Sequence, residues 1–86
     1  MKLVALTPEK ELYQGEVTSV KLPGVGGQFE ILNNHAPIVA ALAAGEVRII
    51  KDSGERLTFN ILKGFVEVIN NEVSVLIQAL AKEDKV

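Results

Sequence analysis

The sequence predicts an all-β protein, folded as a sandwich or a barrel of about eight short strands. It contains eighteen Val and Ile residues and three Thr, and such β-branched side chains lose rotamer freedom in helices but pack well on a pleated sheet. Apolar and polar side chains alternate along several segments, and turn-forming residues separate these segments at short intervals. Alternation buries one face of a strand, so we expect half-buried antiparallel strands.

The second half of the chain contains the clearest strand patterns. In residues 57–61 the apolar side chains of Leu57, Phe59 and Ile61 alternate with polar ones, and residues 73–79 repeat this pattern. Turn-forming residues divide this half of the chain at three places: Asp52-Ser53-Gly54, Lys63-Gly64 and Asn70-Asn71. Their spacing predicts a meander of three tight hairpins.

The first half of the chain supplies further strand candidates. These are Leu3–Leu6, Leu12–Leu22 and Phe29–Leu32, separated by Thr7-Pro8 and by the glycine-rich stretch 23–27. Residues 36–44 are rich in Ala, yet Pro37 and Gly45 bracket them too closely for a stable helix, so we expect an extended and buried segment. We expect residues 1–80 to form one domain and residues 81–86 to be a polar tail.

The composition excludes several classes of site and partner. The absence of Cys rules out disulfides, iron–sulfur clusters and thiolate zinc sites, and the single His rules out His-rich metal sites. The net charge is −2 and the nine basic residues are scattered, which argues against nucleic acid or an anionic membrane as a partner. The longest apolar run, residues 36–44, is shorter than the roughly 20 residues that span a bilayer. The N-terminal stretch lacks a signal-peptide pattern, so we expect a cytosol-facing protein whose contact with membranes is indirect.

The sequence gives little indication of a catalytic site or a nucleotide-binding site. His35 lies in a turn-forming context without a nearby Ser, and its nearest carboxylate is Glu30, so we interpret it as a polar loop residue and not as a general base. The stretch 24–27 resembles a phosphate-binding loop only superficially, because Phe29 and a strand pattern follow and no Lys does. We interpret these glycines as a tight reversal of the chain. No pair of carboxylates stands out as an acid and a base.

Several strands have more apolar residues than one buried face needs. Neighbouring positions are both apolar at four places: Ile49-Ile50, Ile61-Leu62, Val68-Ile69 and Leu76-Ile77. Exposed apolar surface of this kind marks a contact with a partner. The alternative is that these side chains lie under loops or inside a barrel, and the sequence favours neither reading.

A resemblance to a known family reduces the number of functions that the chain could have. Four segments of the chain carry the resemblance: Gly27 to Pro37, Gly45-Glu46-Val47-Arg48-Ile49, Gly64-Phe65-Val66-Glu67-Val68 and Val73-Ser74-Val75-Leu76. Together they resemble the epsilon subunit of F-type ATP synthase. The early stretch Pro8 to Leu22 is similar to the opening strands of that family, so the resemblance runs from Leu3 to about Ala79. It implies an antiparallel β-sandwich of about ten short strands, followed in the family by a helical hairpin that this chain lacks.

The resemblance also implies a role and a set of partners. Members of this family are non-catalytic subunits in the central stalk of the proton-translocating rotary enzyme, where they link the gamma subunit to the c ring. We therefore expect this chain to be no enzyme and to act at the cytoplasmic face of the inner (plasma) membrane as a peripheral part of the complex. We expect no cofactor, no metal, no nucleic acid and no direct membrane insertion. We also expect no nucleotide binding, because the family's inhibitory and ATP-binding functions belong to the absent hairpin.

Residue by residue, the resemblance implies two contact surfaces. The positions that match the family's c-ring contacts are Gln28, Glu30, Ile31, Asn33, Asn34 and His35, and those that match its gamma contacts are Thr7 and Ala40. Two other functions stay open at this point. A free-standing β-sandwich binding module would have the same composition but no affinity for a gamma subunit, and a small hydrolase built around His35 would lose turnover on replacement of that residue.

Overall fold

The regular secondary structure of the described chain consists of strands alone. The computed structural model describes residues 1–80, and the predicted tail 81–86 lies outside them. The seven strands are β1 (Lys2–Leu6), β2 (Glu11–Gly24), β3 (Gly27–Leu32), β4 (Ile38–Leu42), β5 (Gly45–Lys51), β6 (Arg56–Ile69) and β7 (Glu72–Leu80). The predicted all-β class is therefore confirmed. The Ala-rich stretch 36–44 contains a strand, as expected, but its predicted burial is wrong, because alternation turns Val39 and Ala41 outward and exposes them.

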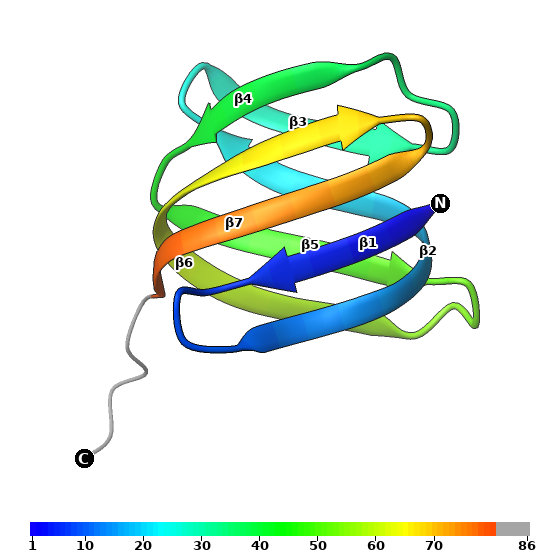
Figure 1. Cartoon of the computed structure of the whole chain (residues 1–86), viewed down its shortest axis with the longest axis horizontal. Coiled ribbons are helices and arrows are strands. Elements are labelled where there is room, and N and C mark those ends of the chain that lie inside the picture. The colour runs from blue at the N-terminus through cyan, green and yellow to red at the C-terminus, as the bar shows by residue number, and fades with distance from the viewer. Residues whose placement is uncertain (81–86) are drawn as a thin grey trace.

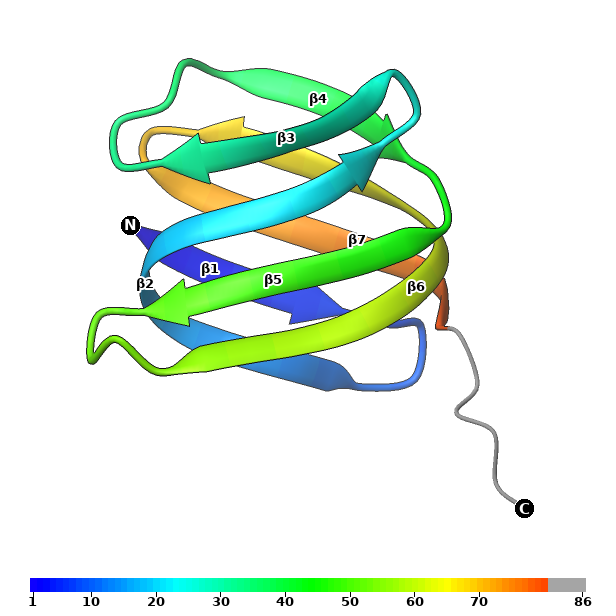
Figure 2. The same ribbon diagram turned by 180° about the vertical axis from the view of Figure 1, so that it is seen from behind.

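The strands form two layers packed face to face, as in a sandwich. Figure 1 views the first layer from outside, with β4, the second half of β6, β7, β1 and the first half of β2 in that order. Figure 2 views the second layer, which contains β3, the second half of β2, β5 and the first half of β6. A bridge between Gly24 and Leu42 joins β2 to β4, so strand pairing continues around the core.

Strand number and direction differ from the expected ten short antiparallel strands. Both β2 and β6 are 14 residues long and pass from one layer to the other without a loop. Each therefore contributes one half to each layer, where two separate short strands were expected. In addition, β1 pairs with β7 in parallel, while the other pairs are antiparallel. β1 lies between β2 and β7 and continues the first layer.

The predicted turn at Lys63-Gly64 is wrong, and these residues form the bend of β6. The register against β7 shifts on both sides of Lys63. A Cβ atom on Gly64 would lie 2.6 Å from the carbonyl oxygen of Leu76, so the absence of a side chain lets the two strands approach at the bend. The other two predicted hairpins are confirmed, because Asp52-Ser53-Gly54 connects β5 to β6 and Asn70-Asn71 connects β6 to β7 with positive φ at both Asn residues.

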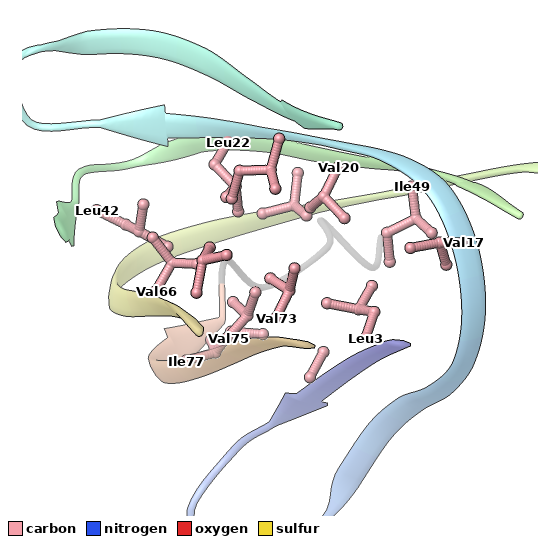
Figure 3. Close-up of a cluster of buried hydrophobic side chains, with 14 of the residues drawn as sticks. Leu3, Val17, Val20, Leu22, Leu42, Ile49, Val66, Val73, Val75 and Ile77 are labelled. Atoms are coloured by element: carbon pink, nitrogen blue, oxygen red, sulfur yellow. The ribbon is translucent and has the colours of Figure 1, made fainter. Parts of the chain in front are cut away.

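The core lies between the two layers and is almost wholly aliphatic. Figure 3 shows side chains from both layers meeting there, among them Leu3 and Val73 from the first layer and Val20 and Ile49 from the second. Each fully buried Leu, Ile or Val contributes about 1.5–3 kcal/mol relative to an exposed side chain. Close packing makes such an interior stiff, which fixes the positions of the outward-facing residues on both layers.

Candidate functional site

The described residues contain no arrangement typical of a catalytic or metal centre. Within residues 1–80, no cluster of three or more His, Cys, Asp and Glu side chains could hold a metal ion. The Nδ1–H of His35 donates to the carbonyl oxygen of Ala36, its next residue, at 2.7 Å, and no carboxylate of the described part of the chain bonds to the ring. Residues 1–80 include no helix with the length and apolar character needed to cross a membrane. The two outer surfaces of the sandwich are the candidate sites, because they hold most of the predicted contact residues and the exposed apolar side chains.

The outer surface of the second layer carries a charged cluster. Glu30 on β3 accepts a hydrogen bond from the hydroxyl of Ser19 on β2 and forms an ion pair with Arg48 on β5, at 3.2 Å. The strand register places Lys21 between Glu30 and Arg48. Ser19 is almost fully buried beneath this pair, whereas both charged side chains are partly exposed. The cluster fixes the carboxylate of Glu30 on the protein surface instead of leaving it free to move.

Three predicted ring-contact residues form the loop after β3, and the neighbouring loops hold this loop in place. The side-chain oxygen of Asn33 accepts a hydrogen bond from the amino group of Met1 at 2.8 Å. The backbone N–H of Asn34 donates to the side chain of Asn71 at 2.7 Å, and that of His35 donates to the carbonyl of Leu32 at 3.2 Å. Asn34 has a φ of 64°, a left-handed conformation that Asn tolerates better than most residues. The loop is thus ordered by several polar contacts.

The six predicted ring-contact residues do not all reach the surface. Gln28 and Glu30 are exposed on β3, and Asn33, Asn34 and His35 follow in the loop, so five of the positions form one continuous edge. Ile31 points the other way, into the core, and has no exposed surface. Alternation along a strand explains this result, because a residue between two outward positions faces inward. Ile31 therefore supports the edge from inside and offers no surface to a partner.

The outer surface of the first layer is apolar at one end. The strand register aligns Leu6 of β1 with Leu76 of β7, Leu76 with Phe65 of β6, and Phe65 with Ala41 of β4. Phe65 and Leu76 keep 41% and 49% of their surface exposed, and Val39 on β4 keeps 74%. We call this outward side of β1, β7, β6 and β4 the apolar face. Large exposed apolar side chains on a small domain mark a contact surface.

A shallow hollow of about 300 Å³ opens on the apolar face. It is lined by Leu6, Thr7, Pro8, Phe65, Leu76, Ile77 and Gln78. The predicted gamma-contact residue Thr7 therefore lies at the edge of an apolar surface. Its hydroxyl also accepts hydrogen bonds from the N–H groups of Glu9 and Lys10 and closes the turn between β1 and β2.

The second predicted gamma-contact residue, Ala40, lies on the inner side of β4. Its side chain is half-buried and packs against the core, while Val39 and Ala41 on either side point outward onto the apolar face. The predicted residue therefore lies on a strand of the apolar face, but its side chain points to the inner side. Val39 and Ala41 are the outward-facing residues of this strand.

The excess of apolar residues that the sequence indicated is divided between the core and the surface. In each neighbouring pair one member is buried. The other member is partly buried at Ile50 and exposed at Leu62, Ile69 and Leu76. Sequence reasoning did not single out Phe65, Val39, Glu67 or Arg48 as surface residues of interest. Alternation within each strand could have placed them on outward faces, but their grouping depends on the pairing between strands.

Comparison with known proteins shows similarity to one family, the epsilon chains of ATP synthase. Residues 1–83 match the family described as "ATP synthase, Delta/Epsilon chain, beta-sandwich domain". The chain is 44% identical over 75 residues to the ATP synthase epsilon chain of Chlorobium limicola, which covers 87% of this chain and 85% of the relative. It is 47% identical over 77 residues to the ATP synthase epsilon chain of Leptospira interrogans, covering 88% of this chain and 59% of that relative.

Two solved structures share the fold at low sequence identity. A chain in the mitochondrial ATP synthase of Euglena gracilis, described as OSCP/F1/c-ring, superposes with a TM-score of 0.85 at 20% identity and covers 92% of this chain and 51% of the other. A chain in the central stalk/c-ring of the Tetrahymena thermophila mitochondrial ATP synthase superposes with a TM-score of 0.77 at 22% identity, covering 95% and 66%. The sandwich architecture is therefore shared with chains of ATP synthase assemblies.

Proposed function

Because the chain belongs to the family of the ATP synthase delta/epsilon chain β-sandwich domain, we propose that it is a non-catalytic central-stalk subunit that links the gamma subunit to the c ring. The observation that carries this proposal is the presence of two outer surfaces of different character on one closely packed sandwich. One is the charged and polar edge of β3 and the following loop, and the other is the apolar face. A subunit that couples two rotor parts needs two such surfaces and a stiff body between them.

The polar edge is the proposed contact with the c ring. Its residues Gln28, Glu30, Asn33, Asn34 and His35 are accessible, and the polar contacts of the loop hold its backbone in place before any partner binds. An ordered surface loses less conformational entropy on association than a flexible one. An edge rich in amide and charged groups is suited to the polar, water-exposed end of a membrane ring.

The apolar face is the proposed contact with the gamma subunit. It includes the hollow beside Thr7 and the outward residues Val39 and Ala41 of β4. Burial of its exposed Phe and Leu side chains provides a favourable free energy of about 25 cal/mol per Å² of apolar surface removed from water. In this arrangement the chain is a peripheral component of the membrane-associated complex on its cytoplasmic side, and it carries out no chemical step of its own.

The test is an assembly experiment with separate readouts for the two partners. The chain is mixed with the gamma subunit and, independently, with the c ring of the same enzyme, and association is measured by co-sedimentation or calorimetry. We expect Gln28→Ala combined with Asn34→Asp to weaken binding to the ring while binding to gamma and the melting temperature stay unchanged. Asn60→Asp, an exposed position on β6 of the same layer, is the control for the added charge.

Two outcomes would contradict the proposal. A chain that binds neither gamma nor the ring would be a free-standing binding module, the alternative function of a different class. A double variant that unfolds would show that the edge serves the fold and not an interface.

A further inference from the structure

The carboxylate of Glu67 lies in the middle of the apolar face. Glu67 projects outward from β6, and the register places Val39 of β4 on one side of it and Ser74 of β7 on the other. Along β6 itself, the outward residues before and after it are Phe65 and Ile69, which alternation sets about 7 Å away on each side. Glu67 is thus surrounded by apolar side chains on both its own strand and β4.

Glu67 has no hydrogen-bond or ion-pair partner among residues 1–80, whereas two other outward-facing carboxylates do. Glu72, on the same face, forms an ion pair with Lys2 at 3.8 Å, and Glu30 on the opposite layer pairs with Arg48 at 3.2 Å. No hydrogen bond or ion pair within the described residues involves the Glu67 carboxylate, which is exposed. All of its acceptor capacity is available to a binding partner.

The surface around Glu67 is hollowed on both sides. The 300 Å³ hollow with Phe65 and Leu76 lies toward one end of the face, and a second hollow of about 240 Å³, lined in part by Pro37, Val39 and Ile69, lies toward the other. Glu67 itself lines the second hollow. The face therefore carries an apolar hollow and, farther along β6, a second hollow that has the Glu67 carboxylate in its lining.

This order restricts what can cover the face. A partner that buried Glu67 against apolar groups would leave an unpaired charge out of water, which costs several kilocalories per mole and opposes binding. A basic side chain opposite Glu67 would remove that cost and add a charge-assisted hydrogen bond. The aromatic ring of Phe65 would in addition favour a cation held beside it.

From this charge complementarity we infer that the segment bound by the apolar face carries one Lys or Arg, which pairs with Glu67, between apolar side chains that enter the two hollows. The inference rests on the proposed function, since it takes the gamma subunit as the partner that supplies this segment. Glu67 then sets the position and orientation of that segment, because only one placement brings the basic side chain to the carboxylate.

The experiment measures the affinity of the 86-residue chain for the gamma subunit of the same enzyme by calorimetry at two salt concentrations. We expect Glu67→Gln to weaken binding about tenfold to a hundredfold, as for the loss of a charge-assisted hydrogen bond, and Glu67→Lys to abolish it. Salt should weaken the wild-type complex more than the Glu67→Gln complex, because screening acts on the ion pair. Glu46→Lys, an exposed carboxylate on the other layer, should bind like the wild type.

The outcomes separate this inference from the function on which it rests. Equal affinity of gamma for the wild type, Glu67→Gln and Glu67→Lys would overturn the inference and leave the proposed function intact. Failure of the wild-type chain to bind gamma would overturn both. The melting temperatures of both Glu67 variants should match that of Glu46→Lys, and a specific loss of stability in them would also contradict a role confined to binding.

Discussion

Replacement of Gly64 by Ala tests the bend of β6, on which the two-layer architecture depends. An added Cβ would lie 2.6 Å from the carbonyl oxygen of Leu76 and 3.4 Å from the Cα atom of Ile77. Both contacts are with the backbone of β7, so no side-chain rotation can relieve them. The neighbouring strand must move, and β7 is held on its other side by five residue pairs with β1.

The expected loss of stability follows from two opposing effects. Overpacking of a close-packed interior costs about 1–3 kcal/mol. The replacement of Gly by Ala also lowers the conformational entropy of the unfolded chain, which stabilises the folded state by about 0.4–1 kcal/mol where the native backbone is compatible. We therefore expect the free energy of unfolding to fall by about 1–2 kcal/mol. For a domain of this size, that corresponds to a melting temperature lower by about 4–16 °C.

The assay is urea and thermal unfolding followed by far-ultraviolet circular dichroism, since the chain contains no Trp to report by fluorescence. Gly26→Ala is the matched control. A Cβ on Gly26 meets no atom within 4 Å and the residue has no positive φ, so this variant should be as stable as the wild type or slightly more so. Equal stability of the two variants would refute the argument, because it would mean that β6 and β7 do not approach closely at Gly64.

Two further predictions separate core residues from surface residues in the predicted contact sets. Ile31→Ala should lower the free energy of unfolding by about 2–5 kcal/mol because it leaves a cavity in the core, whereas Leu32→Ala, on the exposed side of the same strand, should change it by about 0.5 kcal/mol or less in urea unfolding. Ala40→Arg should destabilise the fold by about 1–3 kcal/mol, while Ala41→Arg should preserve the melting temperature and abolish binding to gamma in the same calorimetric assay. A stable Ala40→Arg variant would contradict the inward orientation of that residue.

The alternation of apolar and polar residues was sufficient to predict which side of most strands is buried. Leu57, Phe59 and Ile61 all face the interior, and Val73, Val75 and Ile77 do so in β7. Strand ends were harder to predict where the chain bends without a loop. Lys63-Gly64 has the composition of a turn, but Gly64 acts in a close approach between strands, and sequence alone does not distinguish these two uses of glycine.

The candidate surfaces could be predicted only in part, and the reason is the register between strands. The loop Asn33–His35 was identified as a turn from its own residues. The ion pair between Glu30 and Arg48 was not predicted, because the two residues are 18 positions apart in the sequence. They are brought together by β2, which lies between their strands. Glu67 likewise has no distinctive local sequence, and its position becomes informative only once β4 and β7 are placed beside it.

The path of the two long strands explains how one small domain can serve two contacts. The first half of β6 pairs with β5 in the layer that carries the polar edge, and its second half pairs with β7 and β4 on the apolar face. In the same way β2 pairs with β1 in one layer and with β3 and β5 in the other. A force applied at the polar edge therefore reaches the apolar face through continuous backbone as well as through the packed core. Under the proposed function, this covalent continuity lets the domain transmit torque without sliding between its layers. Two separate sheets that met only through side chains would resist such sliding less.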